Sequence, residues 1–296
     1  MKITFLGTSS MMPTATRNHS SILFNYKDEN ILVDCGEGTQ RQFRVGNLNP
    51  LKITKILITH WHGDHVLGLP GLLQNLYRNN YNKTLEIYGP KGTKLFLQKM
   101  FEWFYSDIKL KISIKEVEEG IFFENQDFKL ECTKLDHKVP CLGYSFIEKN
   151  KRKINMNYLK KFNLKNNPII RELQLGKDII WEGRKIKNKL ATKTISGKKI
   201  SFILDTGFTK NILKLAKDSN VLICESTHGD ELIEKAKKFK HLTSKQAALI
   251  AKQSKCKELI LTHFSQRYKE TNNLLKEAKR VFKNTSAAND FDWFEI

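Results

Sequence analysis

The chain has 296 residues, of which 40% are hydrophobic, so it is long and apolar enough to bury a large core. Its 51 Lys and Arg against 31 Asp and Glu give a net charge of +20, which favours polyanionic partners. No apolar stretch is long enough to span a membrane or to act as a signal peptide, so the sequence excludes a membrane-spanning protein. The five cysteines form no C-x-x-C pair, and we predict a cytoplasmic protein with reduced thiols.

Strand-like and helical patterns alternate along the chain, without an internal repeat or a low-complexity linker. We predict strands at residues 2–6, 20–26, 31–34, 55–59, 85–88, 201–205, 221–225 and 258–262, and helices at 69–77, 93–104, 211–216, 244–253 and 272–282. Elements interleaved in this way predict a single layered α/β domain over residues 1–296.

The densest group of candidate metal ligands follows the predicted strand at 55–59. His60, His62, Asp64 and His65 lie within six positions, and we expect them on the loop that leaves the strand. Imidazole nitrogen and carboxylate oxygen, without thiolate, suit a catalytic zinc site that keeps positions open for water and substrate. The alternative is a chance cluster of polar loop residues, which so dense a set disfavours.

The run H-x-H-x-D-H resembles the signature of the metallo-β-lactamase superfamily. That resemblance implies a four-layer αββα sandwich with two metals at one edge, and three more ligands that each follow a likely strand. It assigns one metal to His60, His62 and His137, the other to Asp64, His65 and His263, and the bridging position to Asp205.

Further segments resemble the ribonuclease Z family, endonucleases that remove 3′ trailers from precursor transfer RNA. The resemblance rests on residues 5–10, 34–42, 68–71, 224–227 and 241–243 and covers nearly the whole chain. It implies a precursor tRNA substrate, a 3′-hydroxyl on the tRNA and a 5′-phosphate on the trailer. The family segment P-x-K-x-R-N has Ala15 where a lysine often sits, so substrate contacts at that loop depart from the family pattern.

The same resemblance implies two Zn²⁺ ions per subunit, which Mn or Fe could replace, and a homodimer. Zinc pairs of this type acidify a water that attacks the phosphate, and Asp64 can accept its proton. His241, oriented by Glu225, is the candidate donor to the leaving 3′-oxygen. The alternative is that His241 caps or packs the helix predicted after Thr243, whose Thr-x-x-Gln pattern is typical of a capping box.

The basic charge is concentrated in residues 149–199, an inserted arm with 16 Lys and Arg against three acids. This window has a net charge of +13, which leaves only +7 for the other 245 residues. Short helical elements are expected at 155–162 and 169–175. The arm resembles the tRNA-binding exosite of ribonuclease Z and would contact phosphates and shape; the alternative is a solvated Lys- and Asn-rich insertion.

Two other functional classes stay open. A small-molecule hydrolase acting on a lactone, thioester or sulfate ester would share the metal ligands but would not need a basic arm. A nucleic-acid-binding protein without catalysis would keep the arm but lose ligands, whereas all seven are present. Preference for precursor tRNA over a generic phosphodiester or ester separates these classes.

Overall fold

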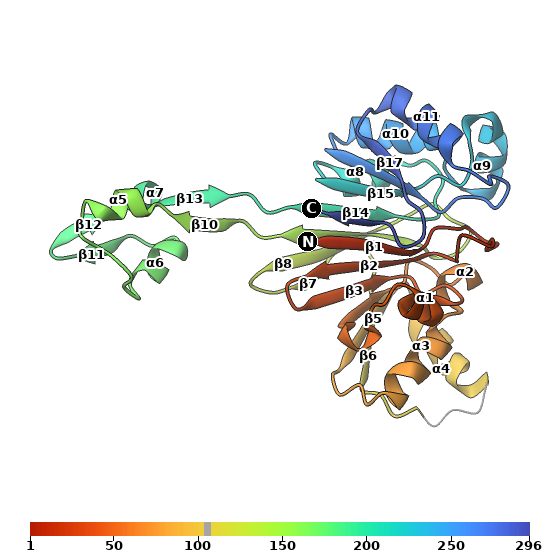
Figure 1. Ribbon diagram of the computed structural model, residues 1–296, viewed down its shortest axis with the longest axis horizontal. Coiled ribbons are helices and arrows are strands. Elements are labelled where there is room, and N and C mark those ends of the chain that lie inside the picture. Colours follow the sequence, from red (N-terminus) through yellow and green to blue (C-terminus); the bar gives the residue numbers. More distant parts are fainter. Residues whose placement is uncertain (104–107) are drawn as a thin grey trace. The chain divides into compact units, whose positions relative to one another are not determined.

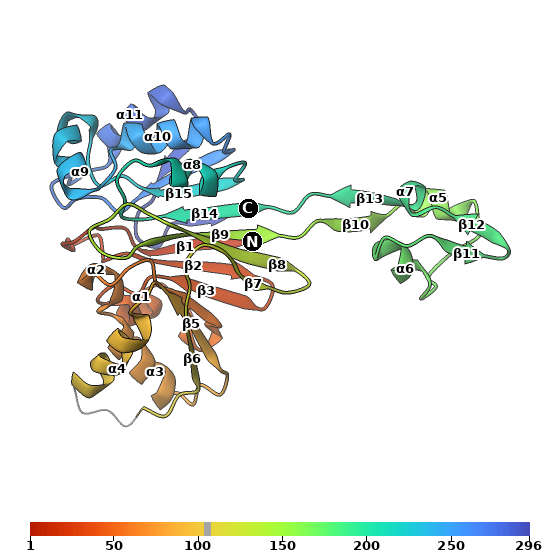
Figure 2. The same cartoon turned by 180° about the vertical axis from the view of Figure 1, so that it is seen from behind.

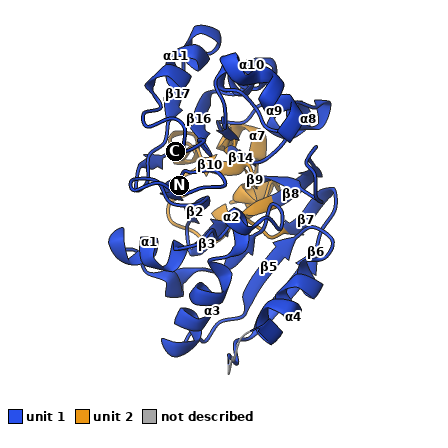
Figure 3. Cartoon of the chain, turned by 90° about the vertical axis from the view of Figure 1, so that its right-hand side faces the viewer, with its two compact units in different colours: residues 1–123, 130–146, 199–296 blue, residues 124–129, 147–198 orange. Residues whose placement is uncertain are grey.

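The computed structural model describes residues 1–103 and 108–296. Contacts between Cα atoms divide it into two compact units (Figure 3). Unit 1 contains residues 1–123, 130–146 and 199–296, and unit 2 contains residues 124–129 and 147–198.

Two seven-stranded sheets form the centre of unit 1, and helices cover their outer faces (Figures 1 and 2). The first sheet has the order β18(Trp293–Glu295), β1(Lys2–Gly7), β2(Ser21–Tyr26), β3(Glu29–Val33), β4(Lys55–Leu57), β5(Leu85–Gly89), β6(Ile112–Glu116). The second has the order β17(Thr285–Ala287), β16(Glu258–Thr262), β15(Val221–Glu225), β14(Lys199–Ile203), β9(Leu142–Glu148), β8(Phe128–Lys134), β7(Gly120–Glu124). This arrangement confirms the predicted four-layer αββα class.

Aromatic side chains join the inner faces of the two sheets. The ring of Phe24 in β2 lies 4.7 Å from that of Phe146 in β9 and 6.2 Å from that of Phe202 in β14, measured between centroids. All three side chains are buried, so they exclude water from the space between the sheets.

The helices of unit 1 bury one apolar side against the sheets. They are α1(Thr39–Val45), α2(Gly63–Val66), α3(Leu69–Arg78), α4(Thr93–Trp103), α8(Lys210–Ala216), α9(Ile233–Phe239), α10(Ser244–Gln253) and α11(Asn272–Val281), with 3-10 turns at Pro50–Lys52 and Asp230–Leu232. In α3 the spacing of Leu69, Leu72, Leu73 and Leu76 places all four on one buried face, against the first sheet. The predicted capping box opens α10, where Thr243 and Gln246 each bond the other's backbone N–H.

Unit 2 has secondary structure and a small core of its own. Strands β10(Lys151–Ile154) and β13(Thr192–Ile195) pair antiparallel, as do β11(Ile179–Trp181) and β12(Arg184–Ile186). The short helices α5(Met156–Lys160), α6(Ile170–Gln174) and α7(Asn188–Ala191) complete it. Its buried apolar side chains are Leu159, Leu164, Leu173, Ile179, Ile186 and Ala191. The two short helical elements expected in this window therefore correspond to α5 and α6.

The structure departs from the sequence expectations at the clustered ligands and in several elements that were not predicted. Asp64 and His65 lie in the four-residue helix α2, where we expected all four clustered ligands on a loop. The strands β6 to β9, β17 and β18 were not predicted, although they belong to the two sheets, and neither were the helices α1 and α9. The last residue of the helix predicted at 93–104, Phe104, lies outside the described residues.

Candidate metal centre

The sequence-predicted ligands come together where strands of both sheets end. Strands β3, β4 and β5 are parallel to one another, as are β14, β15 and β16, so their carboxyl ends share an edge of each sheet. His60 and His62 follow β4, His137 follows β8, Asp205 follows β14 and His263 follows β16.

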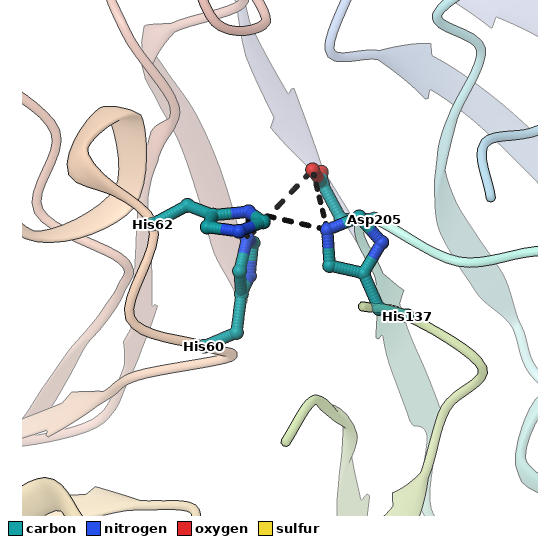
Figure 4. Close-up of side chains that lie close together, drawn as sticks. All are labelled: His60, His62, His137 and Asp205. Atoms are coloured by element: carbon teal, nitrogen blue, oxygen red, sulfur yellow. Dashed lines mark hydrogen bonds and ion pairs between the residues drawn. The ribbon is translucent and has the colours of Figure 1, made fainter. Parts of the chain in front are cut away.

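Three imidazole nitrogens and one carboxylate oxygen form the first group (Figure 4). His62 Nδ1 lies 3.0 Å from His60 Nε2 and 3.2 Å from His137 Nε2. Asp205 Oδ2 lies 3.8 Å from the Nε2 atoms of both His60 and His137. These four side chains point to a common centre, as a metal site requires.

The other oxygen of Asp205 belongs to a second group, with Asp64, His65 and His263. Asp205 Oδ1 lies 2.9 Å from His263 Nε2 and 3.4 Å from His65 Nε2. Asp64 Oδ2 lies 3.3 Å from His65 Nε2 and 3.6 Å from His263 Nε2. Asp205 therefore faces both groups, one oxygen to each, which is the arrangement of a bridging carboxylate.

The residues fit a pair of bound cations. His65 Nε2, His263 Nε2 and Asp205 Oδ1 are buried and have no hydrogen-bond partner among the described residues. Buried polar atoms are normally satisfied, so three buried atoms that face one centre without a hydrogen-bond partner fit the coordination of a cation. Nitrogen and oxygen donors without thiolate suit zinc in a catalytic site.

Four of the five clustered histidines are held at the nitrogen that faces away from the centre. His65 Nδ1 lies 2.6 Å from Asp34 Oδ2, and His263 Nδ1 lies 2.9 Å from Thr227 Oγ1. The corresponding nitrogens of His60 and His137 lie 3.1 Å from Thr59 Oγ1 and 3.3 Å from the Lys240 carbonyl oxygen, respectively. Contacts of this kind fix the tautomer that leaves Nε2 free for a metal.

Sequence reasoning did not assign these supporting residues. Asp34 also accepts hydrogen bonds from the Thr59 N–H and hydroxyl, so it supports His65 directly and His60 through Thr59. Its backbone is left-handed (φ 58°), as is that of His263 (φ 59°). Such strain in a non-glycine residue is found at functional sites. A buried acid between a strand and a glycine loop was the available signal.

The two acids in the ligand set are held ionised. Burial would raise the pKa of Asp64, but His65 and His263 outweigh it and lower the pKa. Burial likewise opposes ionisation of Asp205, yet the surrounding histidines keep its pKa well below the usual range. Both carboxylates are therefore available as negatively charged oxygen ligands for a metal ion.

His241 and Glu225 lie beside the second group and form a pair of their own. Glu225 Oε1 lies 3.2 Å from His241 Nδ1 and accepts from the Thr206 N–H at 2.7 Å, while its Oε2 accepts from the Thr227 hydroxyl at 2.6 Å. Burial lowers the pKa of His241, but Glu225 and Asp205 outweigh it and raise the pKa. Since Thr243 is the N-cap of α10, His241 does not cap this helix.

A cavity of about 520 Å³ opens over these residues. Its lining includes Asp64, His62, His137, Asp205, His241 and His263. A slightly smaller cavity of about 480 Å³, lined by residues 90–91, 117–118, 134–135 and 137–142, shares His137 and Lys138 with it. The larger cavity contains five of the seven candidate ligands, whereas the smaller one contains only His137.

Two stacked sheets, with seven candidate histidine and aspartate ligands at one edge, define a metal-dependent hydrolase of the metallo-β-lactamase fold. YhfI of Bacillus subtilis, a metallo-β-lactamase fold protein, matches with a TM-score of 0.73 and 21% identity over 100% of this chain and 98% of that chain. The chain belongs to the ribonuclease Z family. Ribonuclease BN of Proteus mirabilis is 38% identical over 306 residues, covering both proteins completely.

Two further relatives support the family assignment. Ribonuclease Z of Methanothermobacter thermautotrophicus is 36% identical over 297 residues, 100% of this chain and 97% of the relative. Human tRNase Z, short form, matches with a TM-score of 0.74 and 28% identity over 100% of this chain and 99% of that chain. Residues 1–152 also match the family model described as Anti-Pycsar protein Apyc1.

Among the described residues, no helix combines the length and the apolarity needed to cross a membrane. The five cysteines are free and buried.

Proposed function

We propose that the chain is a zinc-dependent endoribonuclease that removes the 3′ trailer from precursor tRNA. It would leave a 3′-hydroxyl on the tRNA and a 5′-phosphate on the trailer. The observation that supports this most strongly is the geometry of Asp205, whose two oxygens face two ligand groups beside the His241–Glu225 pair. Two-metal sites of this form clamp a phosphodiester.

In this proposal His60, His62 and His137 would hold one ion, Asp64, His65 and His263 would hold the other, and Asp205 would offer one oxygen to each. We propose two Zn²⁺ per subunit, with Mn or Fe as substitutes. Bound zinc would stabilise charge on the scissile phosphate and lower the pKa of an attacking water. The unusual density of nitrogen and oxygen donors supports this metal choice.

The chain's own residues would move the protons. Asp64, held ionised beside His65, would accept the proton of the attacking water. The bond from phosphorus to the 3′-oxygen then breaks, and this oxygen needs a proton. His241 would supply it from Nε2, since Nδ1 faces Glu225. Glu225 would orient His241 and hold its proton in place.

Residues 149–199 would bind the tRNA body. Thirteen of their sixteen Lys and Arg side chains are exposed. Two of their three acids are engaged in ion pairs, Glu172 with Lys177 at 2.8 Å and Asp178 with Lys185 at 3.2 Å. The cationic surface that remains suits the phosphates of a folded RNA, whose deep groove hides its bases.

We also propose a cytoplasmic homodimer, in which the arm of one subunit serves the site of the other. The buried, unpaired cysteines agree with a reducing compartment. If sedimentation shows a fully active monomer, the dimer proposal is wrong, whereas the catalytic proposal is unaffected.

The test of the function is substrate preference. The metal-loaded protein should cut precursor tRNA with a kcat/KM far above that for unstructured RNA of equal length or for bis(p-nitrophenyl) phosphate. A lactone, thioester or sulfate ester turned over faster than the RNA would instead support a small-molecule hydrolase.

A further inference from the structure

Three of the side chains that line the cavity over the candidate metal centre are apolar. Met11, Leu67 and Phe239 line the cavity together with the ligand residues. Their side chains are 72%, 51% and 39% exposed, respectively. Covering exposed apolar side chains with a substrate removes their surface from water and is favourable, so these side chains can contribute to substrate binding.

Phe239 is held in a fixed place relative to the ligand His137. It is the last residue of α9, and Lys240 ends the helix in a left-handed conformation (φ 57°). The carbonyl oxygen of Lys240 lies 3.3 Å from His137 Nδ1, and the Nζ atom of the same lysine lies 2.6 Å from Asp136 Oδ1. Because Lys240 adjoins Phe239, the same contacts that orient His137 also fix the base of the phenyl ring.

The ammonium groups of two lysines lie over this ring. Lys138 Nζ lies 4.6 Å and Lys238 Nζ 5.8 Å from the ring centroid. Lys138 also lines the cavity. An aromatic face with cations beside it favours a ligand that is flat and carries negative charge nearby, whereas a neutral acyl or alkyl group gains nothing from the lysines.

We propose that Phe239 is a stacking platform for an unpaired nucleobase that adjoins the scissile phosphate, and that Lys138 binds the neighbouring phosphate of the same strand. The inference rests on the proposed function, since it names how the RNA strand lies in that site. A base can stack on the phenyl face while the flexible Lys138 side chain turns from the ring to the phosphate. Stacking of this kind tolerates any base, because every base has an aromatic face.

The first test replaces the ring. Phe239→Ala and Phe239→Leu should each raise KM for precursor tRNA by about fivefold to a hundredfold, the range expected when one base loses its stacking partner. Phe239→Trp should stay within about threefold of the wild type, since stacking needs the aromatic face. If Leu restores KM as well as Trp does, the residue is an apolar filler and the proposal is wrong.

The matched control is Trp293→Ala. Trp293 is 58% exposed and also has a lysine over its ring, with Lys2 Nζ 4.8 Å from the centroid, but it does not line the cavity. The substitution Trp293→Ala should leave KM for precursor tRNA unchanged. Metal content, measured on every variant, should equal that of the wild type.

The decisive test removes the base instead. Two precursor tRNAs are prepared, each with an abasic nucleotide on one side of the scissile phosphate. The wild type should bind one of them as weakly as Phe239→Ala binds the intact RNA. Phe239→Ala should lose nothing further on that RNA. If the loss of affinity from removing the base and the loss from Phe239→Ala add for both RNAs, the stacking proposal is wrong. The proposed function still stands in that case, provided that the wild type cleaves the intact RNA. A wild type that cuts no precursor tRNA would remove both.

Discussion

Asp34 Oδ2 lies 2.6 Å from His65 Nδ1, and both side chains are completely buried. Asp34→Asn should weaken metal binding by about 10- to 100-fold, because the amide cannot hold the His65 ring and tautomer as the carboxylate does. Asparagine tolerates the left-handed backbone at this position, so the fold should persist. Competition with a chromophoric chelator measures the affinity.

Asp218→Asn is the control for this substitution. Asp218 also has a left-handed backbone (φ 57°), but it is exposed and is not among the ligand groups. Its variant should bind metal as the wild type does. An equal affinity for Asp34→Asn would show that His65 needs no orienting carboxylate.

His241→Ala should lower kcat on precursor tRNA by about 10²- to 10⁴-fold, the usual contribution of a general acid. Metal content should not change, since His241 belongs to neither proposed ligand set. The loss should be far smaller on bis(p-nitrophenyl) phosphate, whose leaving group needs no proton. Loss of zinc, or proportional loss on both substrates, would mean that His241 has a different role.

Excision of the arm should raise KM for precursor tRNA strongly and leave hydrolysis of a small phosphodiester nearly intact. Lys151 and Ile195 are paired across β10 and β13, so residues 152–194 can be replaced by a two-residue Asn-Gly turn. The slope of log affinity against log salt should become flatter by about 0.7–0.9 for each RNA phosphate that the arm no longer neutralises. Equal loss on both substrates would make the arm part of the catalytic fold.

A smaller change separates charge from shape. Serine substitutions at three exposed arm lysines should raise KM more than serine substitutions at three exposed lysines near the C-terminus. The arm set is Lys160, Lys161 and Lys165, and the control set is Lys276, Lys279 and Lys283. Equal effects would indicate that net charge alone attracts the RNA.

Burial raises the pKa of Asp290 to about 6, although Asn18 N and Thr8 Oγ1 donate to its carboxylate. Because the folded-state pKa exceeds the unfolded value, the native state binds an extra proton between about pH 4 and 6. Ionisation above pH 6 therefore costs on the order of 2–3 kcal/mol of stability.

The free energy of unfolding of Asp290→Asn should lack the pH dependence that the Asp290 carboxyl causes in the wild type. The wild type should lose free energy of unfolding relative to the variant as pH rises from 4 to 6, with a constant difference above pH 6. Urea unfolding at several pH values measures this. A difference that is flat across the whole range would show that the carboxyl is not protonated in the native state.

Elements with a simple burial pattern were predictable from the sequence to within a few residues. Strands β15 and β16 are nearly continuous apolar runs because helices and the other sheet cover both faces. The helix α10 was predicted with the bounds that the structure shows, because Thr243 and Gln246 mark its start. In each case local sequence and tertiary environment agree.

The strands β6 to β8 were missed because their sequences combine charged and apolar residues with little continuous burial. β6 and β7 have no fully buried side chain, and β8 alternates Phe128, Leu130 and Cys132 with Lys129 and Glu131. Their pairing is set by strands elsewhere in the sheets, which a local pattern does not contain.

The ligand positions followed from motif and resemblance, whereas their supports required the fold. Asp34 lies 31 residues before His65, and Thr227 lies 36 residues before His263. Asp34 at least adjoins a glycine loop, whereas threonine is common in turns and Thr227 does not stand out in the sequence. Their roles follow only from the distances between side chains.

The most direct test of the account is to map both ends produced from a precursor tRNA by the metal-loaded protein, the chelated protein and His62→Ala. The account predicts a single cut with a 3′-hydroxyl on the tRNA and a 5′-phosphate on the trailer, lost on chelation and nearly absent in a folded His62→Ala. Cleavage that persists in metal-free buffer, or a cut that leaves a 5′-hydroxyl on the trailer, would contradict it.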